Sequence, residues 1–232
     1  LARMLASLAA YVATVDAGGM QIHQYASTQI RTHLGDGSVV GIDLRTDYPD
    51  DGTISVEITE SPQRPWTLSL RVPTWAAGQR AVLVDVDGRD RAVDPGMVSV
   101  TRSFSPGDRV ILRLPVAPRW VTADPRVDAV RGSVAVERGP LVLCLESTDL
   151  PDKREVDAVR VDPTLAPVER DGHVLVSGDL VSAFEDAPWP YSSSGQGRDG
   201  EEVERVEMPL IPYHSWANRG PSTMRVWLPI RT

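Results

Sequence analysis

The sequence predicts a mainly β protein, in which two antiparallel β-sandwich domains of jelly-roll-like form follow one N-terminal helix. Three observations support this fold class. Apolar and polar residues alternate with a period of two over most of the chain after residue 20. Dipeptides typical of tight turns separate the alternating runs. The length of 232 residues suits two domains of about a hundred residues each.

An amphipathic helix is predicted over residues 1–15. Its apolar residues recur at spacings of three and four, and the pattern stops at Asp16-Ala17-Gly18-Gly19, where glycine supplies the positive φ that ends many helices. The sequence offers no second convincing helix to cover the apolar face, so we expect the chain to have been cut from something longer. The apolar stripe consists of Leu1, Met4, Leu5, Leu8, Val12 and Val15.

Half-buried strands are predicted for the rest of the chain. The clearest are Ile54–Ile58 and Trp66–Val72, in which every second residue is apolar. Similar runs are Met20–Ala26, Ala81–Val86, Met97–Phe104, Arg109–Leu114, Ser133–Val136, Leu141–Leu145, Val174–Ser177, Val203–Met208 and Met224–Leu228. The turn signals between them are Asp51-Gly52, Asp87-Gly88, Pro95-Gly96, Pro106-Gly107 and Asp171-Gly172.

The domains are predicted to span residues 16–120 and 121–232. Pro115, Pro118 and Pro125 interrupt strand pairing around Trp120–Asp128, before a new set of strands begins at Gly132. Residues 187–202, rich in serine and glycine, are predicted to form a long surface loop of the second domain.

Composition excludes several classes of protein. The net charge is −8 and the basic residues are scattered, so nucleic acid is a poor partner. No apolar run approaches the roughly 20 residues that span a bilayer, and residues 1–15 lack the pattern of a signal peptide. We therefore expect a soluble protein without a membrane partner, and its localisation stays unknown.

The sequence shows no recognisable catalytic or metal motif. No two of the four histidines have the spacing of a metal site, and we expect His23 to be a hydrogen-bonded histidine of a sheet. Asp85-Val86-Asp87-Gly88 superficially resembles the start of a calcium loop but is better explained as a hairpin turn. Cys144, the single cysteine, lies among apolar residues and is predicted to be buried, protonated and inert.

The six tryptophans have two interpretations. Some of them could contact a sugar, or, more simply, they pack in the core. Trp66 is predicted to lie in the core, whereas Trp75, Trp189 and Trp216 lie in loops and could be exposed. His214 stands close to Trp216 and is the histidine whose function we would test.

Four stretches of the chain resemble glycoside hydrolase family 127, the β-L-arabinofuranosidase family. The resemblance covers nearly the whole chain, from Leu1 to about Pro229, but only the C-terminal part of the family. The stretches are Leu1–Leu8 with Tyr11 and the Asp16–Met20 turn, Arg71–Ala76, Gly132–Val142 with Cys144–Glu146, and the most specific, Ile211–Pro221 with Met224–Pro229.

The resemblance implies that the chemistry lies outside this sequence. Family members carry an N-terminal (α/α)6 barrel, in which zinc is held by a glutamate and three cysteines, a zinc-bound cysteine is the nucleophile and a glutamate is the acid/base. None of these residues maps onto this chain, and Cys144 does not match the nucleophile motif. Residues 1–15 would be the last helix left over from the barrel, and zinc is expected only in the catalytic domain of the parent enzyme.

We therefore expect an inactive accessory region of an enzyme that acts on β-L-arabinofuranosides or related sugars. It would brace its own N-terminal catalytic barrel or mediate assembly, for example as a homodimer. His214, Trp216 and Arg219 are the candidates for contact with the barrel or with sugar, and no residue of the chain is expected to bind a cofactor. An autonomous carbohydrate-binding module and a purely structural or dimerisation region are the alternatives.

Overall fold

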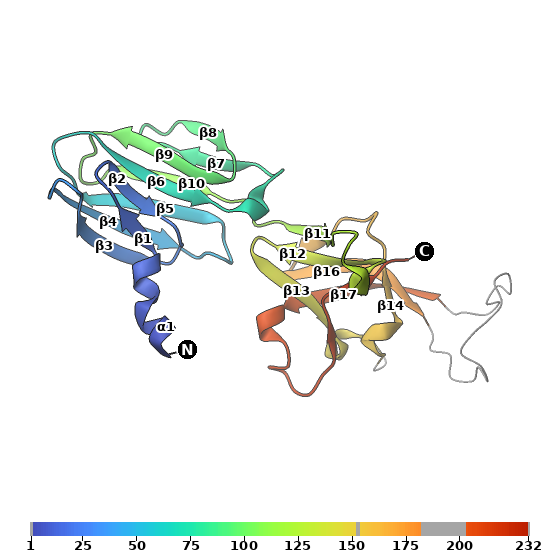
Figure 1. Cartoon of the computed structure of the whole chain (residues 1–232). Coiled ribbons are helices and arrows are strands. Elements are labelled where there is room, and N and C mark those ends of the chain that lie inside the picture. The colour runs from blue at the N-terminus through green and yellow to red at the C-terminus, as the bar shows by residue number, and fades with distance from the viewer. Residues whose placement is uncertain (1, 152–153, 182–202, 232) are drawn as a thin grey trace. The chain divides into compact units, whose positions relative to one another are not determined.

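The computed structural model describes residues 2–151, 154–181 and 203–231, and it divides the chain into unit 1, Leu1–Val116, and unit 2, Ala117–Thr232. Within the described residues the fold is mainly β, as predicted, with one short α-helix and several short 3-10 turns (Figure 1). The predicted loop at residues 187–202, with Trp189, lies outside the described residues. No helix in the described part of the chain is long and apolar enough to cross a membrane.

Unit 1 is a sandwich of two sheets. The described strands form a four-stranded sheet in the order β1-β2-β6-β9 and a six-stranded sheet in the order β3-β4-β5-β10-β7-β8. All pairs are antiparallel except β2 with β6. The strands are β1 Ala13–Val15, β2 Gly19–Ile22, β3 Thr28–His33, β4 Val39–Thr46, β5 Thr53–Glu60, β6 Trp66–Val72, β7 Ala81–Val84, β8 Asp90–Val93, β9 Gly96–Arg102 and β10 Arg109–Arg113.

The core of unit 1 follows from the alternating pattern. Ile54, Val56 and Ile58 of β5 are fully buried, and Trp66 of β6 is 1% exposed. The Trp66 ring packs on Phe104 with 4.8 Å between ring centroids. This confirms the prediction that Trp66 belongs to the core. Trp75, which could have been exposed according to the sequence, is half-buried and packs against the same core.

Unit 2 is also built from antiparallel strands. Its described strands join into one nine-stranded sheet, in which β11-β12-β13-β17-β16-β14 form the main path. β15 pairs with β16, β18 with β13 and β19 with β12. The strands are β11 Pro118–Thr122, β12 Ser133–Arg138, β13 Leu141–Glu146, β14 Val159–Val161, β15 Val168–Arg170, β16 His173–Val181, β17 Val203–Pro212, β18 Met224–Arg225 and β19 Leu228–Pro229.

The division between the units falls after Val116, whereas the sequence suggested residue 120. The segment taken for a linker begins with β11, which pairs with β12 from Pro118 opposite Arg138 to Thr122 opposite Val134. A proline is compatible with this strand because it is the first residue of a strand at the edge of the sheet.

The prediction of one helix over residues 1–15 is wrong beyond Tyr11. The helix α1 covers Ala2–Ser7, a 3-10 turn η1 covers Leu8–Tyr11, and Ala13–Val15 form strand β1 against β2. The β-branched residues Val12, Thr14 and Val15 favour a strand, and the turn at residues 16–18 leads straight into β2. The remaining 3-10 turns of the described chain are η2 Thr74–Ala76, η3 Asp128–Val130, η4 Ser147–Asp149, η6 Val156–Ala158 and η7 Tyr213–Ser215.

Two hairpin predictions are confirmed in atomic detail. The Asp85 carboxylate accepts hydrogen bonds from the backbone N–H groups of Asp87 and Arg89, both at 2.9 Å, so this sequence is a turn between β7 and β8. Asp171 and Gly172 both have positive φ, at 51° and 76°, and they join β15 to β16.

A close backbone approach fixes β2 against β6 and generates a prediction. A Cβ atom at Gly19 would lie 1.9 Å from the carbonyl oxygen of Thr67. We expect Gly19→Ala to lower the free energy of unfolding by about 3 kcal/mol, because the parallel pair would have to separate. Gly18→Ala is the matched control, since its Cβ would meet only the Asp16 carboxylate at 3.3 Å. Urea denaturation measures both variants, and equal stabilities would contradict the constraint.

Candidate functional site

The most specific sequence motif folds into a loop that closes one side of unit 2. We call residues 213–223 the closing loop; it runs from the end of β17 to the start of β18. Backbone hydrogen bonds from Trp216 to Tyr213 and from Asn218 to Ser215 form its first turns. Ala217 has a φ of 61°, a conformation that is strained for alanine and must be stabilised by its surroundings.

The buried carboxylate of Glu146 supplies that stabilisation. Glu146 is the last residue of β13, and it follows Leu145, which faces the core, so its side chain projects from the opposite face of the sheet. Its side chain is fully buried. One oxygen accepts hydrogen bonds from the Ala217 N–H at 3.1 Å and from the Ser222 hydroxyl. The other accepts from the Arg219 guanidinium, whose Nε lies at 3.1 Å.

Arg219 also binds a second carboxylate. Its Nη1 and Nη2 lie 2.7 and 2.6 Å from the two oxygens of Asp149, which the turn η4 places beside the end of β13. The Ser222 hydroxyl, with help from Arg219 and the Ala217 N–H, holds the pKa of Glu146 at about 2. Asp149 and Glu146 together raise the pKa of Arg219. The arrangement is a charge clamp made of Glu146, Arg219 and Asp149.

The structure separates the three predicted site residues by orientation. The Arg219 guanidinium binds the carboxylates of the charge clamp while its side chain stays 46% exposed, and His214 and Trp216 are exposed without contacts to the clamp carboxylates. Trp216 stacks on Tyr213 with 6.4 Å between ring centroids and 25° between ring planes. These two aromatic residues are 38% and 48% exposed, so the clamp holds an aromatic pair at the surface.

An open depression of about 440 Å³ lies beside the clamp. Its apolar residues come from β16 and β17, and its charged residues come from the clamp and from the β15–β16 hairpin. The lining residues are Asp149, Arg170, Asp171, His173, Leu175, Pro209, Ile211 and Arg219. The depression was not predicted from the sequence, because its residues come together only through the pairing register of the strands.

The described residues do not fit a metal or thiolate site. No group of three or more His, Cys, Asp or Glu side chains in the described chain could hold a metal ion. Cys144 is buried, as predicted, and burial followed by the nearby Glu146 and Asp149 raises the pKa of its thiol to about 11. A raised pKa and burial both disfavour the thiolate form that a nucleophile requires.

Comparison with known proteins gives the family. Residues 19–116 match the model of the β-L-arabinofuranosidase GH127 middle domain, and residues 118–229 match the glycoside hydrolase family 127 C-terminal domain. The chain belongs to glycoside hydrolase family 127. It consists of the family's middle and C-terminal domains, which correspond to units 1 and 2.

The chain spans little more than a third of the length of the relatives that it matches here. A non-reducing end β-L-arabinofuranosidase of Bifidobacterium longum is 29% identical over 98% of this chain, which spans 36% of that protein. The crystal structure of a GH127 β-L-arabinofuranosidase from Geobacillus stearothermophilus T6 matches 99% of the chain with a TM-score of 0.81 and 29% identity, over 36% of its length. A further GH127 β-arabinofuranosidase structure matches 99% of the chain at a TM-score of 0.79 and 28% identity, over 37% of its length.

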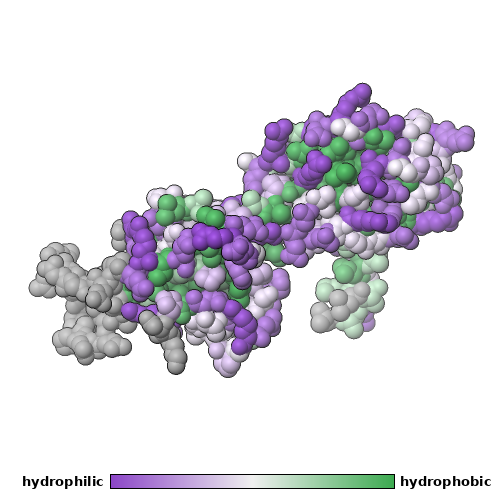
Figure 2. All heavy atoms as spheres, turned by 180° about the vertical axis from the view of Figure 1, so that it is seen from behind, coloured by the Kyte–Doolittle hydropathy of each residue, from purple (hydrophilic) through white to green (hydrophobic). Residues whose placement is uncertain are grey.

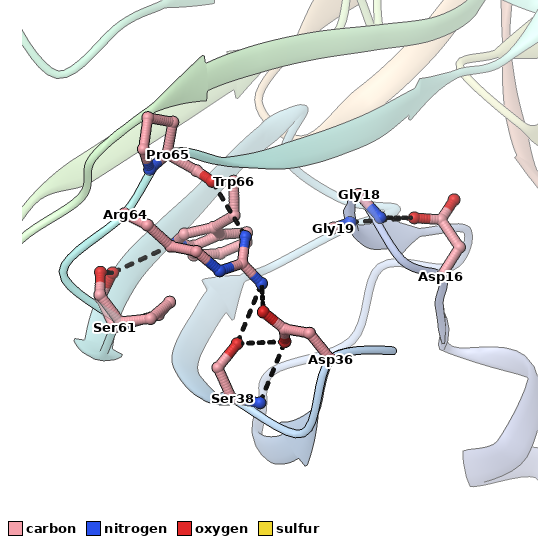
Figure 3. Close-up of polar contacts among 10 residues, drawn as sticks. Asp16, Gly18, Gly19, Asp36, Ser38, Ser61, Arg64, Pro65 and Trp66 are labelled. Atoms are coloured by element: carbon pink, nitrogen blue, oxygen red, sulfur yellow. Dashed lines mark hydrogen bonds and ion pairs between the residues drawn. The ribbon is translucent and has the colours of Figure 1, made fainter.

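A second polar cluster, in the middle domain, is explained by its own loops. The Arg64 guanidinium pairs with Asp36 and donates hydrogen bonds to the Ser38 hydroxyl and the Pro65 carbonyl, both at 3.0 Å (Figure 3). The Ser38 hydroxyl and backbone N–H lower the pKa of Asp36 to about 2. These contacts tie the β3–β4 turn to the loop before β6, so we assign them to the scaffold.

The predicted role of His23 is confirmed in its main point. Its Nε2 lies 2.8 Å from the Thr14 hydroxyl, which also contacts the Gln21 side chain at 2.9 Å. The residue stands directly after β2 and is half-buried. It is a hydrogen-bonded histidine at a strand end, and its contacts suggest no catalytic role.

The charge clamp predicts that removing one negative charge at Glu146 strongly lowers the stability of the protein. We expect Glu146→Gln to lower the free energy of unfolding by about 3 kcal/mol, because Arg219 and the Ser222 hydroxyl lose a buried anionic acceptor. Glu207→Gln is the matched control: Glu207 pairs with Arg170 at the surface, where solvent screens the ion pair and little stability is expected from it. Chemical denaturation followed by circular dichroism compares the two, and similar losses would show that the clamp is no stronger than a surface pair.

Proposed function

We propose that this chain is the accessory β region of a glycoside hydrolase that acts on β-L-arabinofuranosides or related sugars, and that it braces the catalytic barrel of that enzyme. The relatives named as β-L-arabinofuranosidases support the substrate class. The chain spans little more than a third of their length, which leaves room for a separate catalytic domain in the intact enzyme.

The exposed apolar face of the N-terminal segment carries this proposal. Met4 of α1, Leu8 and Tyr11 of η1 and Val15 of β1 are each between 40% and 60% exposed. The helix α1 extends away from the sheets of unit 1 (Figure 1), and Figure 2 shows it mostly in the green of hydrophobic residues. A helix of six residues is unstable alone, so this face needs a partner to bury it.

The last helix of an (α/α)6 barrel fits this description, because neighbouring barrel helices would cover its apolar face. In this proposal the zinc ion and the catalytic residues belong to the barrel, where the metal and its thiolate would supply the nucleophile. The role of this chain is to hold α1 on the middle domain through β1, which pairs with β2 from Ala13 to Val15.

The closing loop is the second surface that we assign to assembly with the barrel. His214 and Trp216 are exposed on a loop whose backbone the charge clamp fixes, so their positions are set before any partner binds. Such preorganisation reduces the entropy lost on association. Arg219 contributes by positioning the loop, because Glu146 and Asp149 occupy most of its donors.

Two leucines with similar exposure test the bracing role. Leu8 on η1 is 47% exposed and Leu165 in unit 2 is 45% exposed. In the intact enzyme we expect Leu8→Asp to lower the melting temperature by several degrees and to reduce hydrolysis of an aryl β-L-arabinofuranoside, since burial of a leucine contributes about 2 kcal/mol. Leu165→Asp should change neither quantity. Differential scanning calorimetry and a chromogenic assay measure the two effects.

The isolated chain provides the control for folding. There Leu8→Asp should leave the melting temperature unchanged, and neither the wild type nor the variant should hydrolyse the substrate. An unaffected intact enzyme would contradict the bracing role. A dimer of the isolated chain that Leu8→Asp dissociates, seen by analytical ultracentrifugation, would favour a dimerisation region instead.

A further inference from the structure

The depression beside the charge clamp combines an apolar floor with charged walls. Leu175 of β16 pairs directly with Pro209 of β17, and Ile211 lies two residues further along β17, so all three face the same side of the sheet. That side is opposite to the core, which contains Val174, Val176 and Leu210. The three floor residues are half-buried and leave part of their carbon surface accessible.

The two arginines in the walls are already paired with carboxylates. Arg170 donates to the two oxygens of Glu207 at 2.9 and 3.2 Å. Arg219 is paired with two carboxylates, those of Asp149 and Glu146. A free anion would therefore meet no uncompensated guanidinium. The polar groups still offer hydrogen-bond donors and acceptors to a neutral ligand.

His173 adds a polar group that is accessible to a ligand. It is exposed at the start of β16, directly opposite Arg170 in the β15–β16 hairpin. The turn residues Asp171 and Gly172 fix this hairpin, so the imidazole is displayed on a rigid element. The volume of about 440 Å³ lies within the range of roughly 300–1,000 Å³ that is usual for small-molecule sites.

We propose that this depression is a binding subsite for a neutral sugar, with the C–H face of the ring on Leu175, Pro209 and Ile211 and its hydroxyl groups on His173, Asp149 and Arg170. An apolar floor with mixed donors and acceptors matches a sugar, which presents both kinds of surface. The assignment of that sugar as an arabinofuranosyl unit rests on the proposed function. The subsite would hold a substrate chain and belongs entirely to unit 2.

Titration of the full ¹⁵N-labelled chain with methyl β-L-arabinofuranoside tests the subsite. We expect saturable shifts in the amide signals of residues 170–175 and of Leu210 and Ile211. His173→Ala should weaken binding about 5-fold through loss of a hydrogen bond. His33→Ala is the matched control, because His33 is also an exposed histidine but lies on β3 of unit 1. It should bind like the wild type.

A second variant places a charge on the floor. Leu175→Asp should abolish the shifts, and unchanged signals from unit 1 and from the closing loop would show that the variant is folded. Equal binding by the His173→Ala variant and the wild type would overturn the role of the imidazole. Absence of saturable shifts at tens of millimolar sugar would overturn the subsite as a whole.

Shifts confined to a different depression would also overturn it. The main competitor is in unit 1, has about 610 Å³ and is lined by residues that include Ser27, Asp43, Arg45 and Asp51. The intact enzyme separates the two proposals. Hydrolysis of an aryl β-L-arabinofuranoside together with no binding by this chain would reject the subsite and leave the proposed function standing. Binding of the sugar by the chain, without hydrolysis by the intact enzyme, would support the subsite and reject the proposed function.

Discussion

Burial of one carboxylate, that of Glu146, is the constraint on which the C-terminal domain depends. A buried charge is costly unless donors surround it, and here every donor comes from the closing loop. The loop consequently has one conformation, including the strained backbone at Ala217. From there the chain returns to the sheet, where β18 pairs with β13 and β19 with β12. The clamp thus links the last part of the chain to β13, in the middle of the nine-stranded sheet.

The middle domain is organised differently. Its two sheets are held by a continuous apolar core, and its polar clusters stabilise turns at the ends of strands. Asp16, for example, accepts the backbone N–H groups of Gly18 and Gly19 at 2.7 and 2.9 Å, which closes the turn before β2 (Figure 3). This chain therefore contains one domain stabilised by its apolar core and a second domain in which a buried ionic group also fixes a surface loop.

Local pattern predicted much of the fold, and failed where long-range pairing decides. β5 and β6 alternate cleanly and were recognised, as were β9, β10 and the core position of Trp66. β3 was missed because Ile30 is its one large apolar residue. Its other residues are threonine, glutamine, arginine and histidine. The helix was overextended, since apolar spacing alone does not show that residues 13–15 pair with β2.

The candidate site shows the same limit. The family resemblance of residues 211–221 marked His214, Trp216 and Arg219, and all three lie on the closing loop. The pairing of Arg219 with Glu146 could not be predicted, because the two residues are 73 positions apart in the sequence. The depression formed by Arg170, His173 and Ile211 depends on strand register, which sequence alone does not give.

Titration of the Glu146 carboxyl group tests the central claim most directly. ¹³C NMR of the labelled chain should give a pKa of about 2, well below the ordinary 4.5. Because the folded pKa is lowered, its contribution to stability is fully present above pH 4.5 and is lost as the pH falls towards 2. The Ala217 amide signal should shift in the same pH range. A Glu146 pKa at or above 4.5 would show that the carboxylate is not held by the loop and would contradict this account.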